Sequence, residues 1–427
     1  MNDQPDLTAS GTLPATGPDL PSSSRFRKFG PGMLVAAAFI GPGTVTTASK
    51  AGAAFGFALC WAIVFSIFAT IILQEMSARL GLVTRQGLGE AVRSSCRTNG
   101  MRLLAGLIVA VAIGVGNAAY QTGNIVGASI GLTLIAGGSI QTWSVIIGSV
   151  AFALLLSGRY RYIETALIGL VLTMSATFLL TAIMVKPDMV ALVKGSFAPG
   201  LPEGSLLTVI GLIGTTVVPY NLFLHASSVC RKWPNDVPTD VALRESRVDT
   251  TAAVVLGGLV TLAIVATAAT AFSEGRTLTS AADMAKQLEP LLGGPAARIF
   301  FAGGLLAAGL TSAITAPLAA AFAISGAMGW STELKSARFR SIWITVLCAG
   351  TCLAAAGLKS PQVTILIAQA ANGLLLPLIT IFLLIAVNRS EQMKDYRNGI
   401  LANVLGGAVV LITLLLGATA IYKMCFV

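Results

Sequence analysis

The sequence predicts an all-α membrane protein with eleven transmembrane helices: two inverted five-helix repeats with broken helices 1 and 6, plus one extra helix. The chain is 55% hydrophobic and only 11% charged, whereas soluble domains carry about 25% charged residues. Apolar segments long enough to cross a bilayer recur along it. Two of these segments are interrupted by Gly or Pro, at residues 39–44 and 215–221. Breaks at corresponding positions are typical of transporters built from inverted repeats.

The apolar segments divide the chain into a short tail and one membrane domain. Residues 1–24 are rich in Pro, Ser, Thr and Asp, which predicts a disordered cytoplasmic tail. Residues 25–427 form a single transmembrane domain, with repeats at about 30–186 and 203–388 and an extra helix at 397–423. A further short helix is expected at 280–288. The eleven spans are expected near 32–54, 57–80, 101–128, 140–157, 161–185, 204–228, 247–272, 297–328, 339–357, 362–387 and 399–422.

The basic residues indicate the orientation of the chain. Most of the 28 Lys and Arg residues fall in every second loop of the predicted topology. If the N-terminus is inside, these loops all lie on the inner side of the membrane. The positive-inside rule then places the N-terminus in the cytoplasm and the C-terminus outside, in a bacterial inner (plasma) membrane. The net charge of +10 therefore reflects membrane topology. The expected partner of the protein is the lipid bilayer. Nucleic acid is not expected as a partner, and nothing in the sequence specifies an oligomeric state.

The reactive residues argue against an enzyme. The six cysteines form no CxxC pair and there is a single histidine, which excludes a multi-His metal site. No Ser/His/Asp set or phosphate-binding loop is found. We therefore expect no catalytic residues, no cofactor and no resident metal.

Four segments resemble the Nramp family of proton-coupled divalent-metal transporters, over roughly residues 28–422. The first break reads Gly41-Pro42-Gly43-Thr44 and is similar to the family's first helix; the second contains Val218-Pro219-Tyr220-Asn221, as in its sixth. Residues 305–315 resemble its eighth helix, and Gln369 matches a polar residue of its tenth. The resemblance implies the family's fold.

The chain departs from the family pattern where the resemblance implies metal ligands. In the family the first break reads Asp-Pro-Gly-Asn, and its Asp and Asn bind metal; here those positions are Gly41 and Thr44. The family's Met-Pro-His in the sixth helix is replaced at Val218 and Tyr220. Asn117 and Tyr120 align with an Asp and a Glu that help carry the proton.

These departures predict an electropositive site for a small oxyanion. Each half-helix that follows a break presents unpaired N–H groups and a partial positive charge. With no carboxylate to oppose them, we expect bicarbonate as the substrate, followed by nitrate, formate or another small carboxylate. Lys50 would add positive potential near the outer mouth. The predicted substrate-binding residues are Gly41, Gly43, Thr44, Thr46, Thr47, Thr215, Val218, Tyr220, Asn221 and Gln369.

Uptake of an anion would need a second ion. Moving one negative charge inward against 100 mV costs about 2.3 kcal/mol, so a Na+ or H+ co-substrate is expected. The candidate residues for this ion are Thr311, Ser312, Thr315 and His225.

Two other functions remain open at this point. The first is transport of a divalent metal ion, Mg2+ or Mn2+, since Mg2+ keeps several waters and tolerates fewer protein ligands. The second is a sensor or scaffold that transports nothing. Three acids near the predicted inner helix ends, Glu75, Glu164 and Asp249, are expected to form structural ion pairs or inner-gate contacts. They lie beside Arg79, Arg161 and Arg247.

Overall fold

A computed structural model of the chain describes residues 40–157, 161–272, 278, 280–357 and 360–426. These residues form helices and connecting loops, and no strand occurs among them. The first half of the described chain holds α2 (Pro42–Phe55), α3 (Cys60–Thr84), α4 (Leu88–Ser94), α5 (Asn99–Ala136), α6 (Ile140–Ser157), α7 (Arg161–Val185), α8 (Met189–Phe197), α9 (Leu206–Thr216) and α10 (Pro219–Lys232). The second half holds α11 (Thr239–Ala271), α12 (Ala281–Ala285), α13 (Glu289–Leu292), α14 (Gly294–Met328), α15 (Ala337–Ala355), α16 (Pro361–Val387), α17 (Ser390–Met393) and α18 (Ile400–Phe426), with single 3-10 turns at Lys286–Leu288 (η2) and Lys394–Tyr396 (η3).

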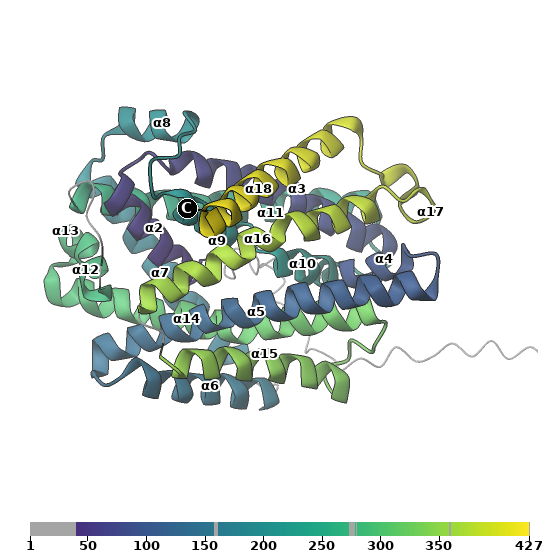
Figure 1. The fold of residues 1–427 in the computed structure, drawn as a ribbon, viewed down its shortest axis with the longest axis horizontal. Coiled ribbons are helices and arrows are strands. Elements are labelled where there is room, and N and C mark those ends of the chain that lie inside the picture. Colours follow the sequence, from purple (N-terminus) through teal and green to yellow (C-terminus); the bar gives the residue numbers. More distant parts are fainter. Residues whose placement is uncertain (1–39, 158–160, 273–277, 279, 358–359, 427) are drawn as a thin grey trace, which may run out of the picture.

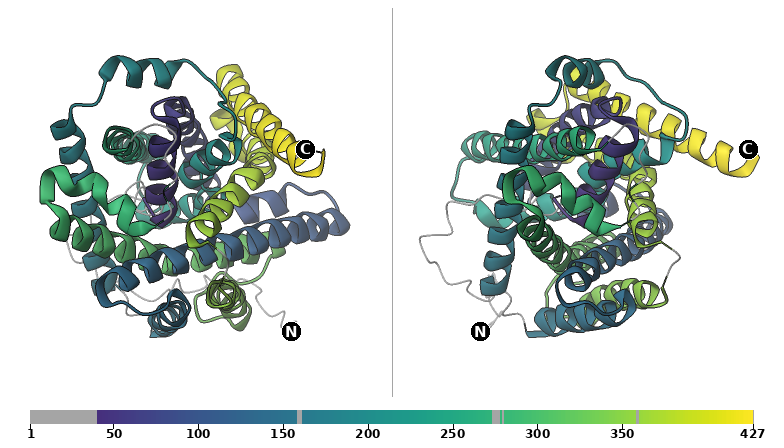
Figure 2. Two further views of the ribbon diagram at one scale, coloured as in Figure 1. Left: turned by 60° about the vertical axis from the view of Figure 1, so that its left-hand side comes forward. Right: turned by 90° about the vertical axis from the view of Figure 1, so that its left-hand side faces the viewer.

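The long helices run side by side in one bundle. In Figure 1, α5, α14 and α16 cross the picture nearly parallel, and α6 and α15 pack together along the lower edge. The short helices α12 and α13 lie at one end of the bundle, and α4 and α17 lie at the opposite end. The views in Figure 2 show α2 and the broken pair α9–α10 surrounded by the longer helices. The broken helices are therefore central.

The helices account for the predicted spans. Nine of the described helical segments are long and apolar enough to cross a membrane, counting α9 and α10 together. α15 coincides with the expected span at 339–357, but it falls outside these nine. The first span begins before Ile40, outside the described residues, as does the predicted tail at 1–24. The all-helical membrane fold is confirmed, whereas the number eleven stays a prediction. The helix expected at 280–288 is present as α12 and η2.

Small residues bring α5 and α14 into close contact at the centre of the bundle. A Cβ atom added to Gly309 would lie 2.7 Å from the carbonyl oxygen of Asn124 and 2.6 Å from the Ala128 methyl. Asn117 and Gln121 of α5 donate side-chain hydrogen bonds to carbonyls of α14, at 3.1 and 3.0 Å. Close backbone approach and interhelical hydrogen bonds are what hold helices together in lipid, where apolar burial offers little.

This contact gives a direct test of the packing. We expect Gly309→Ala to lower the free energy of unfolding by about 1–3 kcal/mol, because its methyl overlaps backbone atoms of α5. Gly303 lies on the same helix with nothing within 4 Å of an added Cβ, so Gly303→Ala is the matched control and leaves stability unchanged or slightly higher. Unfolding in detergent by denaturant titration measures both; equal effects would contradict the packing.

Candidate functional site

The second break separates α9 from α10. α9 ends at Thr216, and α10 begins with Pro219, whose missing N–H suits the first position of a helix. The Val217 N–H still donates to Ile213 at 2.8 Å, and the Asn221 N–H donates to the Val218 carbonyl at 3.0 Å. The carbonyl end of one half-helix therefore meets the N–H end of the next, deep in the protein. The predicted break in the sixth span is confirmed.

The first break lies directly against the second. α2 starts at Pro42, and the Gly41 carbonyl accepts from the Val45 N–H at 3.2 Å. The hydroxyl oxygens of Thr44 and Thr215 are 2.8 Å apart, and both residues are fully buried. One hydrogen bond thus joins the two breaks, 171 residues apart in sequence. Thr44 and Thr215 were both predicted as site residues, and the structure brings them together.

Gln369 of α16 covers the first break. A Cβ atom added to Gly43 would overlap the Gln369 amide, so only glycine at this position lets the amide approach the backbone. Gln369 is fully buried, and neither its nitrogen nor its oxygen has a hydrogen-bond partner in the described part of the chain. Gly43 was predicted as a substrate-binding residue, and in the structure it leaves room for an amide from another helix.

Ser312 and Tyr120 face Gly41 from α14 and α5. The position of a Cβ atom on Gly41 lies 3.3 Å from the Ser312 hydroxyl oxygen and 3.7 Å from that of Tyr120. The Tyr120 ring packs edge-on against Tyr220, with 5.4 Å between ring centres. Sequence reasoning assigned Ser312 to a coupling ion and left Tyr120 out of the substrate site. The alignment that placed Tyr120 at a family acid was the signal that could have included it.

Further polar groups near the break lack partners. Both polar side-chain atoms of Asn221 and the Thr47 hydroxyl are buried without a hydrogen bond to any described residue. An unpaired buried polar group costs about 1–3 kcal/mol, so several in one place usually mark a functional site. Asn221 immediately follows the break, which makes it the strongest of these candidates.

Other predicted residues have different surroundings. The hydroxyls of Thr311 and Thr315 donate within α14, to Ala307 at 2.8 Å and to Thr311 at 3.1 Å. His225 is buried, with its Nε2 atom 3.2 Å from the Thr250 hydroxyl. Thr46 is buried on α2, Val218 is buried in the break before α10, and Lys50 is half-buried in the second half of α2. Of the four coupling-ion candidates, only Ser312 is placed against the first break.

The site is electrically neutral in its side chains. Threonine, serine, tyrosine, asparagine and glutamine surround the breaks, and no group of three or more His, Cys, Asp or Glu able to hold a metal occurs among the described residues. The expected loss of carboxylates at the breaks is therefore seen directly at Gly41, where no side chain stands between the backbone and Ser312.

Gln287 closes the end of the bundle near α12. Its amide nitrogen donates to the Ser49 hydroxyl at 2.8 Å, and its oxygen accepts from Thr267 at 3.2 Å. All three residues are fully buried. The middle of α2 is thereby tied to α11 and to the short helix η2.

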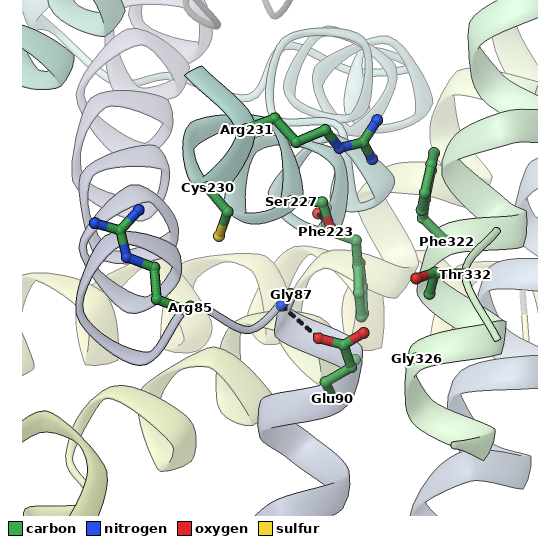
Figure 3. Close-up of a pocket in the computed structure, with 11 residues that line it drawn as sticks. Arg85, Gly87, Glu90, Phe223, Ser227, Cys230, Arg231, Phe322, Gly326 and Thr332 are labelled. Carbon is green, nitrogen blue, oxygen red and sulfur yellow. Dashed lines mark hydrogen bonds between the residues drawn. The ribbon is translucent and has the colours of Figure 1, made fainter. Parts of the chain in front are cut away.

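A cavity of about 200 Å³ lies at the opposite end, between α4, α10 and α14. Its lining includes Glu90, Phe223, Cys230 and Arg231 (Figure 3). Phe223 is 1% exposed and stands three residues after Tyr220 on α10. The cavity therefore reaches to within one helical turn of the site.

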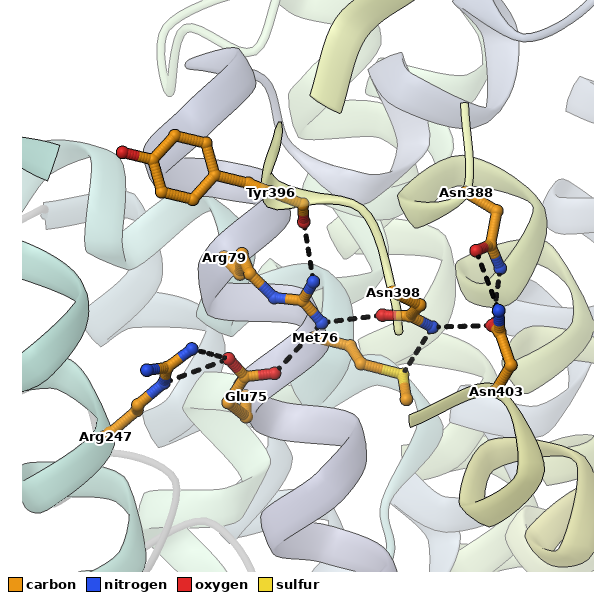
Figure 4. A network of polar contacts seen from close by, with 8 residues as sticks. All are labelled: Glu75, Met76, Arg79, Arg247, Asn388, Tyr396, Asn398 and Asn403. Atoms are coloured by element: carbon orange, nitrogen blue, oxygen red, sulfur yellow. Dashed lines mark hydrogen bonds and ion pairs between the residues drawn. The ribbon is translucent and has the colours of Figure 1, made fainter. Parts of the chain in front are cut away.

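Ion pairs bind the helices around that end. Glu75 pairs with Arg79 at 3.1 Å and with Arg247 at 2.8 Å. Arg79 also donates to Asn398 at 2.6 Å and to the Tyr396 carbonyl at 2.6 Å, which links α3 to the segment before α18 (Figure 4). The predicted structural role of Glu75 is confirmed. Asp249 pairs with Lys232 at 4.0 Å instead of with Arg247.

The chain is similar to known transporters over nearly all of its length. The sequence model of the family described as natural resistance-associated macrophage protein-like, or Nramp, matches residues 32–423. The divalent metal cation transporter MntH 1 of Pseudomonas aeruginosa is 33% identical over 309 residues, which cover 70% of this chain and 69% of that protein. The divalent metal cation transporter MntH of Aeromonas hydrophila is 29% identical over a region that covers 95% of this chain and 99% of that protein.

Solved structures show the same fold. A manganese transporter from Eremococcus coleocola superposes with a TM-score of 0.76 at 24% identity, covering 95% of this chain and 89% of that one. The nucleobase-cation-symport-1 family transporter Mhp1 has a TM-score of 0.56 at 15% identity, covering 93% of this chain and 94% of that one. At these identities the likeness concerns the fold alone.

These relatives contradict the predicted anion substrate. The proteins that match are named divalent metal cation transporters, so the prediction of bicarbonate, or another small anion, as the partner is wrong. The Na+ or H+ co-substrate was inferred from the anion's charge and loses its basis with it. The error has a physical cause, because the break between α9 and α10 presents the carbonyl end of one half-helix as well as the N–H end of the next, and only the N–H end was weighed.

The fold, the site and the comparisons agree. A broken helix packs against α2, the helices α5, α14 and α16 bring polar side chains to it, and the family model matches nearly the whole chain. This protein is an integral membrane protein that belongs to the Nramp family of transporters.

Proposed function

We propose that this protein carries a hard divalent metal cation, Mg2+ or Mn2+, across the membrane by alternating access. The observation that carries the proposal is the pair of buried amide side chains without hydrogen-bond partners in the described part of the chain, Asn221 and Gln369, beside the joined breaks. The names of the bacterial relatives, which are divalent metal cation transporters, favour the same substrate class.

The oxygen atoms of this site suit a hard cation. The amide oxygens of Asn221 and Gln369 are of the carbonyl type that Mg2+ and Mn2+ accept as ligands. The carbonyl end of α9 adds a partial negative charge at Thr216 and Val217. In inverted-repeat transporters such half-helix ends commonly hold the transported or coupled cation.

The missing carboxylates determine the form of the ion. A bare double charge surrounded only by neutral groups at membrane depth would be very unstable. Mg2+ gives up its waters reluctantly and is usually bound with several of them in place. We therefore propose that the ion crosses partly hydrated, with water mediating much of its contact to Thr44, Thr215 and Ser312.

The orientation and the repeats belong to the same proposal. We place the N-terminus and the end of the bundle that carries α4 and α17 in the cytoplasm, because Arg85, Arg93 and Arg231 gather there. The C-terminus then lies outside. The two breaks, at the start of α2 and between α9 and α10, would then be the corresponding points of repeats at about 30–186 and 203–388.

Uptake into proteoliposomes tests the substrate class. We expect Mn2+ to enter vesicles that contain the protein, as detected by quenching of an enclosed metal-sensitive dye, and Mg2+ to compete with it. Protein-free vesicles are the control. Mn2+ and Mg2+ fluxes no greater than in those vesicles would contradict the proposal.

Replacing Gln369 separates function from folding. Gln369→Met keeps the volume but removes an amide that has no partner, so the free energy of unfolding should stay the same or rise. The same change removes a proposed ligand, and we expect KM for Mn2+ to rise roughly tenfold, equivalent to about 1.4 kcal/mol. Gln141, exposed on α6, provides the control Gln141→Met, which should alter neither quantity. A destabilised Gln369→Met with normal uptake would count against the assignment.

Val218 determines which metals compete. A methionine at this position in the family offers a thioether, which prefers soft metals, whereas valine offers only methyl groups. We expect Cd2+ to compete weakly with Mn2+ in the natural protein. Val218→Met should strengthen that competition about tenfold, or about 1.4 kcal/mol, as measured by Cd2+ inhibition of uptake. Val209→Met, at a buried position on α9, is the control; an equal gain there would show that the effect is not local.

A further inference from the structure

Asn372 of α16 is a buried amide that the proposed function does not yet use. Its side chain is 1% exposed, and its Nδ2 atom has no hydrogen-bond partner in the described part of the chain. A buried polar group without a partner destabilises the folded protein, whereas an apolar group of the same shape does not. Leucine would therefore be the more stable residue at this position, and the amide indicates a role other than packing.

The periodicity of α16 determines the direction in which this amide points. Gln369 faces α2, since a Cβ atom added to Gly43 would overlap its amide, and Leu375 faces α5, since a Cβ atom added to Gly116 would overlap its side chain. Asn372 is three residues from each of them. Three residues turn a helix by about 300°, so Asn372 lies midway between Gln369 and Leu375 around the helix. Its side chain is therefore directed at the boundary between α2 and α5.

The contacts between α16 and α5 set the level of Asn372 in the bundle. These helices touch at two points, Leu375 against Gly116 and Ala368 against Gly123. Asn372 lies between the two points on α16, and Tyr120 lies between them on α5. The amide is therefore at the level of the tyrosine whose hydroxyl faces the first break.

Asn372 also lies on the cytoplasmic side of Gln369. α16 runs from Pro361 to Val387, and its last residues lead directly into α17 (Figure 1). Three residues advance a helix by about 4.5 Å. Asn372 is therefore one turn nearer than Gln369 to the end of the bundle that we place in the cytoplasm.

The turn that carries both amides is held against α9. A Cβ atom added to Gly214 would overlap the Gln369 carbonyl, and one added to Gly373 would lie 2.7 Å from the Ile210 carbonyl oxygen. These two glycines let the backbones of α9 and α16 meet just before the break that ends α9. The backbone beneath the Asn372 amide is thus fixed relative to the break.

We propose that Asn372 is a third amide of the metal site and binds a water molecule of the hydrated ion on its cytoplasmic side. This inference rests on the proposed transport of a hard divalent metal. Water bound to a cation directs its hydrogen atoms outwards, and an amide oxygen accepts such hydrogen bonds. Half a turn of the amide exchanges its oxygen with Nδ2, and no partner of Nδ2 opposes that rotation.

Two substitutions of Asn372 are expected to act in opposite directions. Asn372→Leu keeps the size and removes the acceptor, so Kd for Mn2+ should rise about tenfold, the loss typical of a group in the outer shell of a metal. Asn372→Asp places a carboxylate in the same position, so Kd should fall at least about tenfold, because affinity for hard cations increases with the charge of their ligands. Titration calorimetry of Mn2+ with the purified full-length protein measures both.

Two further variants are matched controls. Thr380→Val removes a buried hydroxyl of α16 that also lacks a partner, about 12 Å further along the helix. Asn235→Asp adds a negative charge at an exposed position. Neither should change Kd for Mn2+. Asn372→Leu should unfold no more easily than the natural protein, so it tests the role of Asn372 even if Asn372→Asp does not fold.

The outcomes separate this role from the transport proposal. A rise in Kd that is confined to Asn372→Leu supports the role. Mn2+ binding that Asn372→Leu leaves unchanged, or that Thr380→Val weakens equally, overturns it and leaves the transport proposal intact. A folded Asn372→Asp variant that binds Mn2+ no more tightly than the natural protein also overturns it. If the natural protein binds neither Mn2+ nor Mg2+, both proposals are wrong.

Discussion

The hydrogen bond between Thr44 and Thr215 joins the first turn of α2 to the break between α9 and α10, deep in the protein. Backbone polar groups cannot be left exposed to lipid, so irregular backbone at this depth must be enclosed by protein. The enclosure is formed by α5, α14 and α16, which bring Tyr120, Ser312 and Gln369 against the breaks. Most of the fold can be understood as a wall of unbroken helices around one polar centre.

The electrostatic potential at that centre depends on partial charges of opposite sign at the helix ends. The N–H end of a half-helix carries roughly half a positive charge, and the carbonyl end of its partner carries roughly half a negative one. At the break between α9 and α10 both ends are present within a few residues. The two nearly cancel, so the oxygen-bearing side chains of Asn221 and Gln369, and the water that accompanies an ion, decide what binds. The absence of carboxylates therefore does not by itself select an anion.

The spans and the second break could be predicted because both follow from local composition. Long apolar segments indicate the spans, and Val218-Pro219 within one of these segments indicates the break. The predicted pair Thr44 and Thr215 also proved to be in contact. The amide of Gln369 above Gly43, and Ser312 facing Gly41, depend on how distant helices pack. No local pattern carries that information. Likewise, Gln287 gave no signal in the sequence, since its role arises only from the position of η2 against Ser49 and Thr267.

The two ends of the bundle are built differently, and the difference bears on alternating access. At the end near α12, the buried Gln287 amide connects α2 to α11, and opening there requires breaking hydrogen bonds that are shielded from water. At the other end, a cavity already extends to Phe223, and the ion pairs of Glu75 hold the surrounding helices without filling it. Phe223, which lines this cavity, lies one helical turn from Tyr220 beside the breaks. This conformation therefore favours exchange with the side that carries Glu90, and reaching the opposite side requires α2 to separate from Gln287.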